Sequence, residues 1–280
     1  MQTHTSVSDL RDALRAHRLN GKRVGLVPTM GALHEGHLSL VRTVQRCSDV
    51  TVCSIFVNPK QFNDPRDYEA YSVNLERDAA LLAGEGVDFL FAPHVSEVYS
   101  PDFQTAVRVG QLGDLLEGAS RPGHFVGVAT VVSILFNAVA PRLAIFGEKD
   151  FQQLRVIEQM VEDLKFDIEV IRGELVRDTD GLALSSRNVR LSPEGRRNAL
   201  AIHRGLVSAQ AMAQQGERSA ERLEGVVRRF LGEIAVAEID YIVAVREDTL
   251  TRSEVISPLS RMLVAVTVEG VRLLDNIPLR

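Results

Sequence analysis

The sequence has only two cysteines and no uninterrupted apolar run long enough to cross a lipid bilayer. Its longest apolar stretch, 125–140, is broken by polar residues and is too short to span a membrane. Two cysteines build no disulfide framework in a chain of 280 residues, so Cys47 and Cys53 are predicted to be reduced core residues. Segment 1–20 lacks the apolar core of a signal peptide. These absences predict a cytoplasmic protein with no membrane partner.

The chain also has no excess of positive charge. Its formal net charge is −5, which gives no general basis for nucleic-acid binding. The composition, 45% hydrophobic and 25% charged, is that of a folded protein with a sizeable core. At about 150 residues per domain, the length predicts two domains, with one large α/β domain as the alternative.

Residues 1–174 alternate apolar, strand-like segments with amphipathic, helix-like segments. Strands that are apolar on both faces and separated by helices are typical of a parallel sheet covered on both sides. We therefore expect an α/β fold with a Rossmann-like, doubly wound parallel sheet. The predicted strands span 22–27, 50–57, 87–92, 105–109, 143–146 and 166–171, and the predicted helices span 8–18, 38–46, 67–83, 126–139 and 150–163.

Residues 175–280 show a different pattern. Ser192 and Pro193 are typical of a helix start, and two long helices, 192–215 and 218–231, are predicted to follow. Three β-like segments then predict a small sheet that we expect to be antiparallel. The sequence thus predicts a smaller C-terminal α+β domain, with the strands at 238–245, 262–268 and 271–275.

A turn with two histidines and two glycines, 28–37, joins the first predicted strand to the next helix. Ligands of open α/β sheets bind at the carboxyl ends of strands, and a helix N-terminus offers backbone N–H groups to a phosphate. His34 and His37 can donate to phosphate oxygens, while Gly31 and Gly36 permit close approach of the backbone. The turn therefore predicts a phosphate site. A zinc site without a clear third ligand and an incidental structural turn are the less favoured alternatives.

A second segment, 146–153, also lies between a predicted strand and a helix. Lys149 is a mobile charge suited to a phosphate, whereas Asp150 is equally well explained as a helix N-cap. A third segment, 180–188, presents two hydroxyls and a guanidinium in Ser185, Ser186 and Arg187. That trio suits a polyphosphate, and a polar loop between domains is the alternative.

Two further loops carry polar side chains of interest. Asn58 and Gln61 follow the second predicted strand, beside the histidine turn. Arg121 and His124 lie in a glycine-rich loop before an apolar helix, and either can instead be a solvated loop residue. We assign no role to the remaining histidines, His4, His17, His94 and His203.

Taken in order, four of these segments resemble the pantothenate synthetase (pantoate–β-alanine ligase) family of the HIGH-type nucleotidyltransferase superfamily. They are PTMGALHEGH at 28–37, RPGHFVGV at 121–128, FGEKDFQQL at 146–154 and DGLALSSRN at 180–188. The ordered set is specific, although the chain beyond Leu191 carries little signature.

The resemblance implies an ATP-dependent condensation of (R)-pantoate with β-alanine to pantothenate. It implies a pantoyl-adenylate intermediate, release of AMP and pyrophosphate, and Mg²⁺ bound with the ATP. It also implies a Rossmann-like domain at 1–174 for ATP and pantoate, a lid domain at 175–280, and a homodimer.

The resemblance further implies roles for individual residues. His37 matches the proton donor, and we group His34 and Lys149 with it as catalytic candidates. Gln61 and Gln153 match the pantoate-binding glutamines, with Gln61 also serving β-alanine, and Asn58, Arg121 and His124 are additional substrate-binding candidates. Asp78 is a candidate magnesium contact, with a solvated helix residue as the alternative. The implied ATP site comprises Met30, Gly31, Ala32, Leu33, His34, Glu35, Gly36, His37, Gly147, Glu148, Lys149, Asp150, Val176, Leu184, Ser185, Ser186 and Arg187.

The chain departs from the family pattern at two places. Lys60 stands where the family usually has methionine, beside the acid-binding glutamine, and either points to solvent or alters substrate binding. Residues 71–74 read Tyr-Ser-Val-Asn where the family tends to have Tyr-Pro-Arg-Thr, which puts the local loop and the Asp78 assignment in doubt.

Three other functions use the same features. A nucleotidyltransferase would leave the nucleotide on its product instead of releasing AMP. An aminoacyl-tRNA synthetase is disfavoured because no anticodon domain is evident. A regulatory module would bind ATP without splitting it and would leave the phosphate-facing donors without a catalytic use.

Overall fold

The computed structural model describes residues 1–280 except 64, 70, 72–73, 233 and 235–236. The chain divides into two compact units. The N-terminal unit comprises Met1–Glu148 and Gln152–Glu174, and the C-terminal unit comprises Lys149–Phe151 and Leu175–Arg280. The short segment around Lys149 therefore groups with the C-terminal unit, although it lies far upstream in the sequence.

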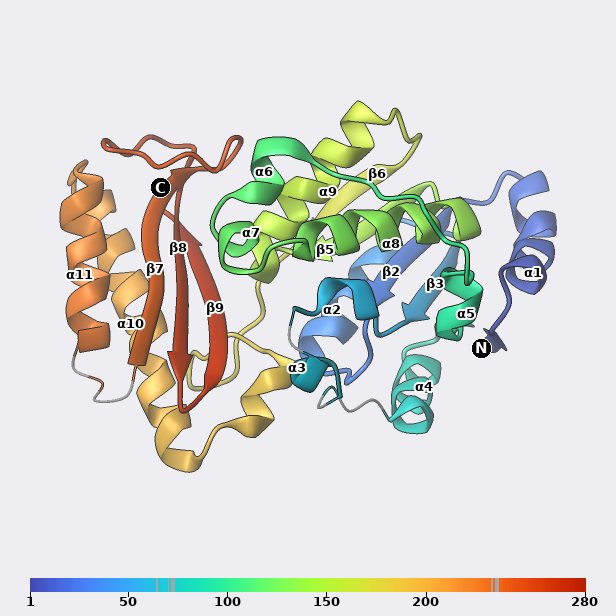
Figure 1. The fold of residues 1–280 in the computed structure, drawn as a ribbon, viewed down its shortest axis with the longest axis horizontal. Coiled ribbons are helices and arrows are strands. Elements are labelled where there is room, and N and C mark those ends of the chain that lie inside the picture. Colours follow the sequence, from blue (N-terminus) through green and yellow to red (C-terminus); the bar gives the residue numbers. More distant parts are fainter. Residues whose placement is uncertain (64, 70, 72–73, 233, 235–236) are drawn as a thin grey trace. The chain divides into compact units, whose positions relative to one another are not determined.

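The N-terminal unit is built on a six-stranded sheet in the order β1-β4-β3-β2-β5-β6, with every adjacent pair parallel (Figure 1). The central strands are buried because helices cover both faces, which confirms the predicted Rossmann-like architecture. The strands are β1 (Gln2–His4), β2 (Val24–Thr29), β3 (Val50–Ile55), β4 (Phe89–Phe91), β5 (Leu143–Gly147) and β6 (Glu169–Gly173).

Helices α2 (Glu35–Gln45) and α4 (Leu75–Gly84) cover one face of this sheet, where Val41, Val44 and Leu82 join the strand residues in one apolar cluster. Helices α1 (Val7–Leu19), α8 (His124–Val139) and α9 (Phe151–Asp163) form the other layer. Helix α1 packs on α8, and Ser133 of α8 lies 3.1 Å from the sulfur of Met160 in α9. The short helices are η1 (Pro59–Gln61), α3 (Pro65–Glu69), α5 (Val95–Val98), α6 (Gly110–Asp114), α7 (Glu117–Ser120) and η2 (Glu148–Asp150).

Two local expectations were wrong, and one strand was not expected at all. Segment 105–109 forms no strand, and its residue Val107 donates its backbone N–H to the Thr130 hydroxyl of α8 instead of to a neighbouring strand. The helix expected at 67–83 is two helices, α3 and α4, and Asn74 caps the second by accepting from the N–H of Arg77. Strand β1 was missed because three residues carry too little periodic signal.

The C-terminal unit contains an antiparallel sheet in the order β7-β8-β9, which confirms the expected small α+β fold. Helices α10 and α11 pack against the sheet on one side (Figure 1). A separate apolar core lies between helices and sheet, so this unit buries its own hydrophobic surface. Its elements are η3 (Ser186–Arg190), α10 (Pro193–Gln214), α11 (Ala220–Gly232), β7 (Ala237–Arg246), β8 (Ser260–Val268) and β9 (Val271–Pro278).

The two cysteines differ in environment. Cys53, on β3, is fully buried, as expected, and burial raises the pKa of its thiol to about 12. Cys47 is exposed, which corrects the expectation that both thiols lie in the core. The residue follows α2, where the chain turns toward β3 and the side chain is no longer on the apolar face. No helix in the described part of the chain combines the length and apolarity needed to cross a membrane.

We expect only Cys47 to react with a thiol reagent in the native protein. Thiol reagents attack the thiolate, and the raised pKa keeps Cys53 protonated at neutral and mildly alkaline pH, where it is also inaccessible. A spectrophotometric thiol titration should therefore count one thiol before unfolding and two after. Cys47→Ser is the matched control and should leave the native protein unreactive; reaction of two native thiols would contradict the buried position of Cys53.

Candidate functional site

Three neighbouring strands of the N-terminal unit end at the same edge of the sheet. Strand β2 lies between β3 and β5, and its last residue, Thr29, is paired with Ile55, the last residue of β3. The chain order reverses here, because β3 follows β2 on one side while β5 comes much later on the other. Such a switch point is where open α/β sheets bind ligands. The sequence predicted chemistry in the loops after all three strands.

The loop after β2 is a tight left-handed turn. Gly31 and Ala32 have φ values of 82° and 51°, a conformation that costs free energy at a residue with a side chain. The Thr29 hydroxyl accepts from the N–H of Gly31 at 3.2 Å and donates to the carbonyl of Ser54 on β3 at 2.7 Å. Thr29 therefore ties the first residue of the turn to the neighbouring strand.

Asp78 holds the next two residues of this turn. Its carboxylate accepts from the N–H of Ala32 at 2.7 Å and from the N–H of Leu33 at 3.0 Å. The side chain is fully buried in the first turns of α4, and the Arg77 guanidinium lies 3.4 Å away. Among the described residues, no group of three or more His, Cys, Asp or Glu is arranged to hold a metal ion. Asp78 thus holds the turn, and its full burial shows that the solvated position considered from sequence is wrong.

The two histidines of the turn cap α2, and backbone N–H groups determine the tautomer of each ring. The Nδ1 atom of His34 accepts from the N–H of Gly36 at 3.2 Å, and the Nδ1 atom of His37 accepts from the N–H of His34 at 3.3 Å. Because each Nδ1 accepts, the hydrogen of each neutral ring is on Nε2. The ring centroids are 4.1 Å apart, so the two Nε2–H donors belong to one compact pair.

This capping changes the expected source of phosphate contacts. Sequence reasoning expected free backbone N–H groups at the start of α2, but those of Gly36, His37 and Leu38 all bond to His34. The amides of Ala32 and Leu33 are likewise bonded to Asp78. Donors for an anion must therefore come mainly from the side chains of this turn.

The loop after β3 places Gln61 at the end of η1, where it is 8% exposed. Its backbone carbonyl is held by two predicted substrate-binding residues, because His124 Nδ1 lies 2.7 Å from it and the Arg121 guanidinium 3.2 Å. Asn58 is 1% exposed and bonds to the Gln61 side chain at 3.1 Å. Asn58, Arg121 and His124 thus all contact Gln61.

Beyond β5 the predicted residues lie on two units. Gly147 ends β5 and Glu148 follows it, while Gln153 is half-buried near the start of α9. The neighbouring Gln152 is buried and holds the loop before α8, since it accepts from the N–H of Glu117 and donates to two carbonyls of that loop. Lys149 belongs to the C-terminal unit, and its ammonium lies 3.1 Å from Asp150.

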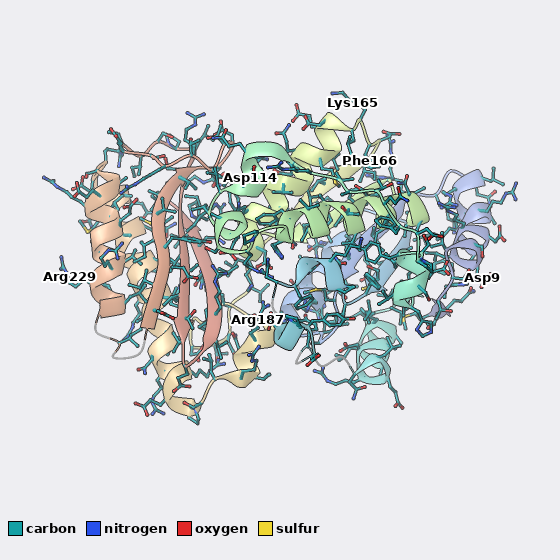
Figure 2. The ribbon with its side chains drawn as sticks, viewed as in Figure 1. Asp9, Asp114, Lys165, Phe166, Arg187 and Arg229 are labelled. Carbon is teal, nitrogen blue, oxygen red and sulfur yellow. The ribbon has the colours of Figure 1, made fainter. Side chains whose placement is uncertain are left out.

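The predicted hydroxyl and guanidinium trio begins η3 of the C-terminal unit. Ser185 is the N-cap, and its hydroxyl accepts from the N–H of Arg187 at 3.2 Å. Arg187 is labelled in Figure 2 on the segment that leads into α10. Val176 accepts from the N–H of Leu184 at 3.0 Å, which closes the intervening loop. The predicted ATP residues between 176 and 187 therefore lie in this closed loop or directly after it.

A buried ion pair braces that loop. Arg177 makes a two-point contact with Asp275 of β9 at 2.7 and 2.8 Å and also donates to the carbonyl of Gly181. The His203 ring packs against Gly181, where an added Cβ would lie 2.6 Å from the ring. Burial and the nearby Arg177 charge lower the pKa of His203, so the ring favours its neutral form. His203, to which the sequence gave no role, supports the loop by packing.

Sequence reasoning missed four residues that position this chemistry: Thr29, Tyr99, Arg177 and Asp275. Thr29 stands inside the histidine turn, 28–37, but its hydroxyl was given no role there. Tyr99, Arg177 and Asp275 stand in none of the motif segments, and each acts through a partner far away in the sequence, so no local signal marks them.

Comparison with known proteins decides the family. The family model for pantoate-beta-alanine ligase matches residues 2–278. The chain belongs to the pantoate–β-alanine ligase family. A pantothenate synthetase of Aquifex aeolicus is 48% identical over 271 residues, with 96% of both chains covered. Because the family consists of ligases, the chain is an enzyme of this class.

Solved structures of family members share the fold. The pantothenate synthetase of Thermus thermophilus has a TM-score of 0.95 and 46% identity, covering 100% of this chain and 99% of that one. The Francisella tularensis pantoate-beta-alanine ligase, solved with beta-gamma ATP and beta-alanine, has a TM-score of 0.81 and 32% identity, covering 100% and 98%. Both comparisons therefore extend over the two units of the ligase described here.

Lys60, the first departure from the family pattern, lies against two aromatic rings. The Lys60 ammonium lies 4.8 Å from the Tyr99 ring centroid and 4.5 Å from that of Phe103, a cation–π arrangement. In the second departure, 71–74, residues 72–73 lie outside the described residues. Asn74 caps α4, the helix that carries Asp78.

We expect Asp78→Asn to destabilise the ligase by about 1–3 kcal/mol and to raise its KM for ATP. The asparagine retains one acceptor and turns its NH₂ group toward the second backbone N–H, so the turn at Ala32 and Leu33 loses a partner in a buried place. Urea unfolding and ATP saturation kinetics measure the two effects.

Glu76→Gln is the matched control, since it removes an exposed negative charge from the same helix turn. It should leave the KM for ATP unchanged. If Asp78→Asn kept its stability but required more Mg²⁺, Asp78 would be a metal contact and the positioning role would be wrong.

Proposed function

We propose that this ligase joins (R)-pantoate to β-alanine at the expense of ATP, through a pantoyl-adenylate intermediate. In the first step a pantoate carboxylate oxygen bonds to the α-phosphorus of ATP, and the bond to pyrophosphate breaks. In the second step the β-alanine nitrogen bonds to the acyl carbon, loses a proton, and the bond to AMP breaks. The products are pantothenate, AMP and pyrophosphate.

The observation that carries the proposal is the paired cap of α2. It gives His34 and His37 the tautomer with hydrogen on Nε2, at the switch point of the sheet. Two N–H donors of this kind suit the oxygens of a triphosphate, on which negative charge builds as pyrophosphate leaves. In this proposal His37 donates to the leaving phosphates, and His34 both orients it and contributes a second donor.

The remaining roles follow from charge. A carboxylate that attacks a triphosphate meets like charge, so catalysis depends on positioning and on positive groups. We assign those groups to Lys149, Ser185, Ser186 and Arg187. We assign the orientation of pantoate to Gln61 and Gln153, whose uncharged amides bind an acid without neutralising its attacking carboxylate.

Arg121, His124 and Asn58 act in this proposal through Gln61, which all three contact. The family pattern assigns contacts with the nucleotide to residues 30–37, 147–150, 176 and 184–187, and the proposal keeps that assignment.

Magnesium enters the proposal as part of the MgATP substrate. The described side chains provide no cluster of carboxylates for the ion, and both oxygens of Asp78 already accept backbone hydrogen bonds. The phosphate oxygens and water would supply its ligands, as is usual for Mg²⁺ with nucleotides. No step is therefore assigned to a protein-bound metal.

The proposal gives residues 1–174 the binding of ATP and pantoate and residues 175–280 the role of a lid. A lid suits the chemistry because an acyl adenylate is readily hydrolysed, and closure excludes water from it. The family pattern further implies a homodimer in the cytoplasm.

The decisive experiment follows the products of each step. MgATP and pantoate alone should yield pyrophosphate, and AMP with pantothenate should appear when β-alanine is added. Folded protein that binds ATP without releasing pyrophosphate in response to pantoate would contradict the proposal. A product that retains the nucleotide after the amine is added would favour a nucleotidyltransferase instead.

We expect Lys149→Ala to lower kcat by more than about tenfold, the scale of one lost transition-state contact. The Lys149 side chain is 20% exposed and its ammonium pairs with the half-exposed carboxylate of Asp150, so its removal should leave the fold intact. Steady-state kinetics measure the effect, and Lys22→Ala, at an exposed lysine of the N-terminal unit, is the control. Unchanged kcat in folded Lys149→Ala would refute the assigned role.

A further inference from the structure

The side chain of Gln61 is the end of a buried chain of hydrogen bonds that begins at the backbone. Asn58 forms the middle of this chain. Its Oδ1 accepts from the N–H of Lys60 at 3.2 Å and from the Tyr99 hydroxyl at 2.8 Å. Its Nδ2 donates to the carbonyl of Gly127 at 3.1 Å and to Oε1 of Gln61 at 3.1 Å. All four hydrogen-bonding positions of the Asn58 amide are thus used within the protein.

The backbone partners permit only one orientation of the Asn58 amide. An N–H group can only donate and a carbonyl can only accept, so Oδ1 must face Lys60 and Nδ2 must face Gly127. A flipped amide would set donor against donor and acceptor against acceptor in a place that is 1% exposed. Leaving buried polar groups unpaired is costly, and the orientation is therefore fixed.

That orientation passes to Gln61. The second hydrogen of Asn58 Nδ2 requires an oxygen, so Oε1 of Gln61 faces Asn58 and Nε2 faces away from it. The Nε2 atom lies 2.8 Å from the sulfur of Met30, in the turn that follows β2. The side of the Gln61 amide that faces this turn is thus its N–H side, and it presents donors only.

The backbone of Gln61 is fixed as firmly as its side chain. Its carbonyl is held by His124 and Arg121. Helix α8 also packs closely on η1, since a Cβ added at Gly127 would lie 2.3 Å from the carbonyl oxygen of Lys60. This close approach restricts movement of η1 toward α8.

Tyr99 completes the chain as a permanent donor. The residue is 8% exposed, and burial raises the pKa of its hydroxyl to about 12, so the proton stays in place at working pH. The ring is held by Phe103 at a centroid distance of 4.9 Å and by the Lys60 ammonium above it. The hydroxyl therefore reaches Asn58 from a rigid support.

We propose that Asn58 and Tyr99 are positioning residues that fix the Gln61 amide with its N–H groups toward the acid, so that the site selects an oxygen acceptor there. The inference rests on the proposed function, in which Gln61 contacts pantoate. The backbone partners of Asn58 would in this way determine which substrate group Gln61 prefers. A glutamine amide that rotated freely could instead bind a hydrogen-bond donor or a hydrogen-bond acceptor equally well. It also assigns Asn58 an indirect role instead of direct substrate contact.

The test is a double-mutant cycle between Asn58→Leu and Gln61→Ala, read in pantoate-dependent pyrophosphate release. Asn58→Leu alone should lower kcat/KM for pantoate by about tenfold or more, the scale of one misplaced hydrogen bond. The KM for ATP should stay within about twofold, a split that general loss of structure would not produce.

The combined variant should be no worse than Gln61→Ala alone, because Asn58 acts only through Gln61. Additive losses in a folded double variant would overturn the proposal.

Tyr99→Phe provides the second, gentler variant. It removes the hydroxyl but keeps the ring that supports Lys60, and Asn58 keeps both backbone partners. We expect a rise of a few fold in KM for pantoate, with kcat and the KM for ATP little changed. Tyr68→Phe is the matched control, since its ring packs on Phe62, beside Gln61 in sequence, while the hydrogen-bonding positions of Asn58 are all used by other residues. A rise in KM for ATP equal to that for pantoate would count against this relay, the hydrogen-bond chain from Tyr99 through Asn58 to Gln61.

Failure of the relay and failure of the proposed function give different results. If the wild-type chain releases no pyrophosphate with pantoate, the proposed function is wrong and the relay, which depends on it, falls with it. If the wild-type chain is active and the two substitutions act additively, only the relay is wrong.

Discussion

The parallel pairing of β2 with β3 on one side and β5 on the other is the constraint on which the site depends. Thr29 and Ile55 are register partners at the ends of their strands, so the loops that follow begin side by side. Parallel strands need long crossover connections, which is why residues that meet here are far apart in sequence. The sheet thus brings the histidine turn and the Gln61 loop to one edge before any side-chain chemistry is considered.

The backbone N–H groups of the turn after β2 and of the start of α2 are bonded within the protein, and this decides which atoms remain for chemistry. The left-handed turn cannot satisfy its own amides, so Thr29 and Asp78 accept them, and the two histidines accept those at the start of α2. Buried amides rarely stay unpaired in folded proteins. The same bonds that stabilise the turn therefore fix the tautomers of the histidines and leave mainly side-chain donors available in the turn.

Much of the fold was predictable because its signals are local. The apolar segments that became β2, β3 and β5 are buried on both faces, and residues such as Ser192 and Pro193 mark a helix start in isolation. Weak or short signals failed: β1 has three residues, and segment 105–109 has β-like composition but pairs with a helix side chain. Composition alone could not show which β-like segments have a strand as neighbour.

The sequence by itself determined the alternation of elements, the two fold types, and the order of the motifs that carry the chemistry. Only the tertiary structure decided which of those polar residues hold another part of the chain. Asp78 lies 46 positions from Ala32, and Asn58 lies 69 positions from Gly127. The role of a carboxylate or an amide depends on the partners that its lone pairs and hydrogens meet. Those partners come from segments far apart in the sequence that the fold brings together, which no local sequence pattern encodes.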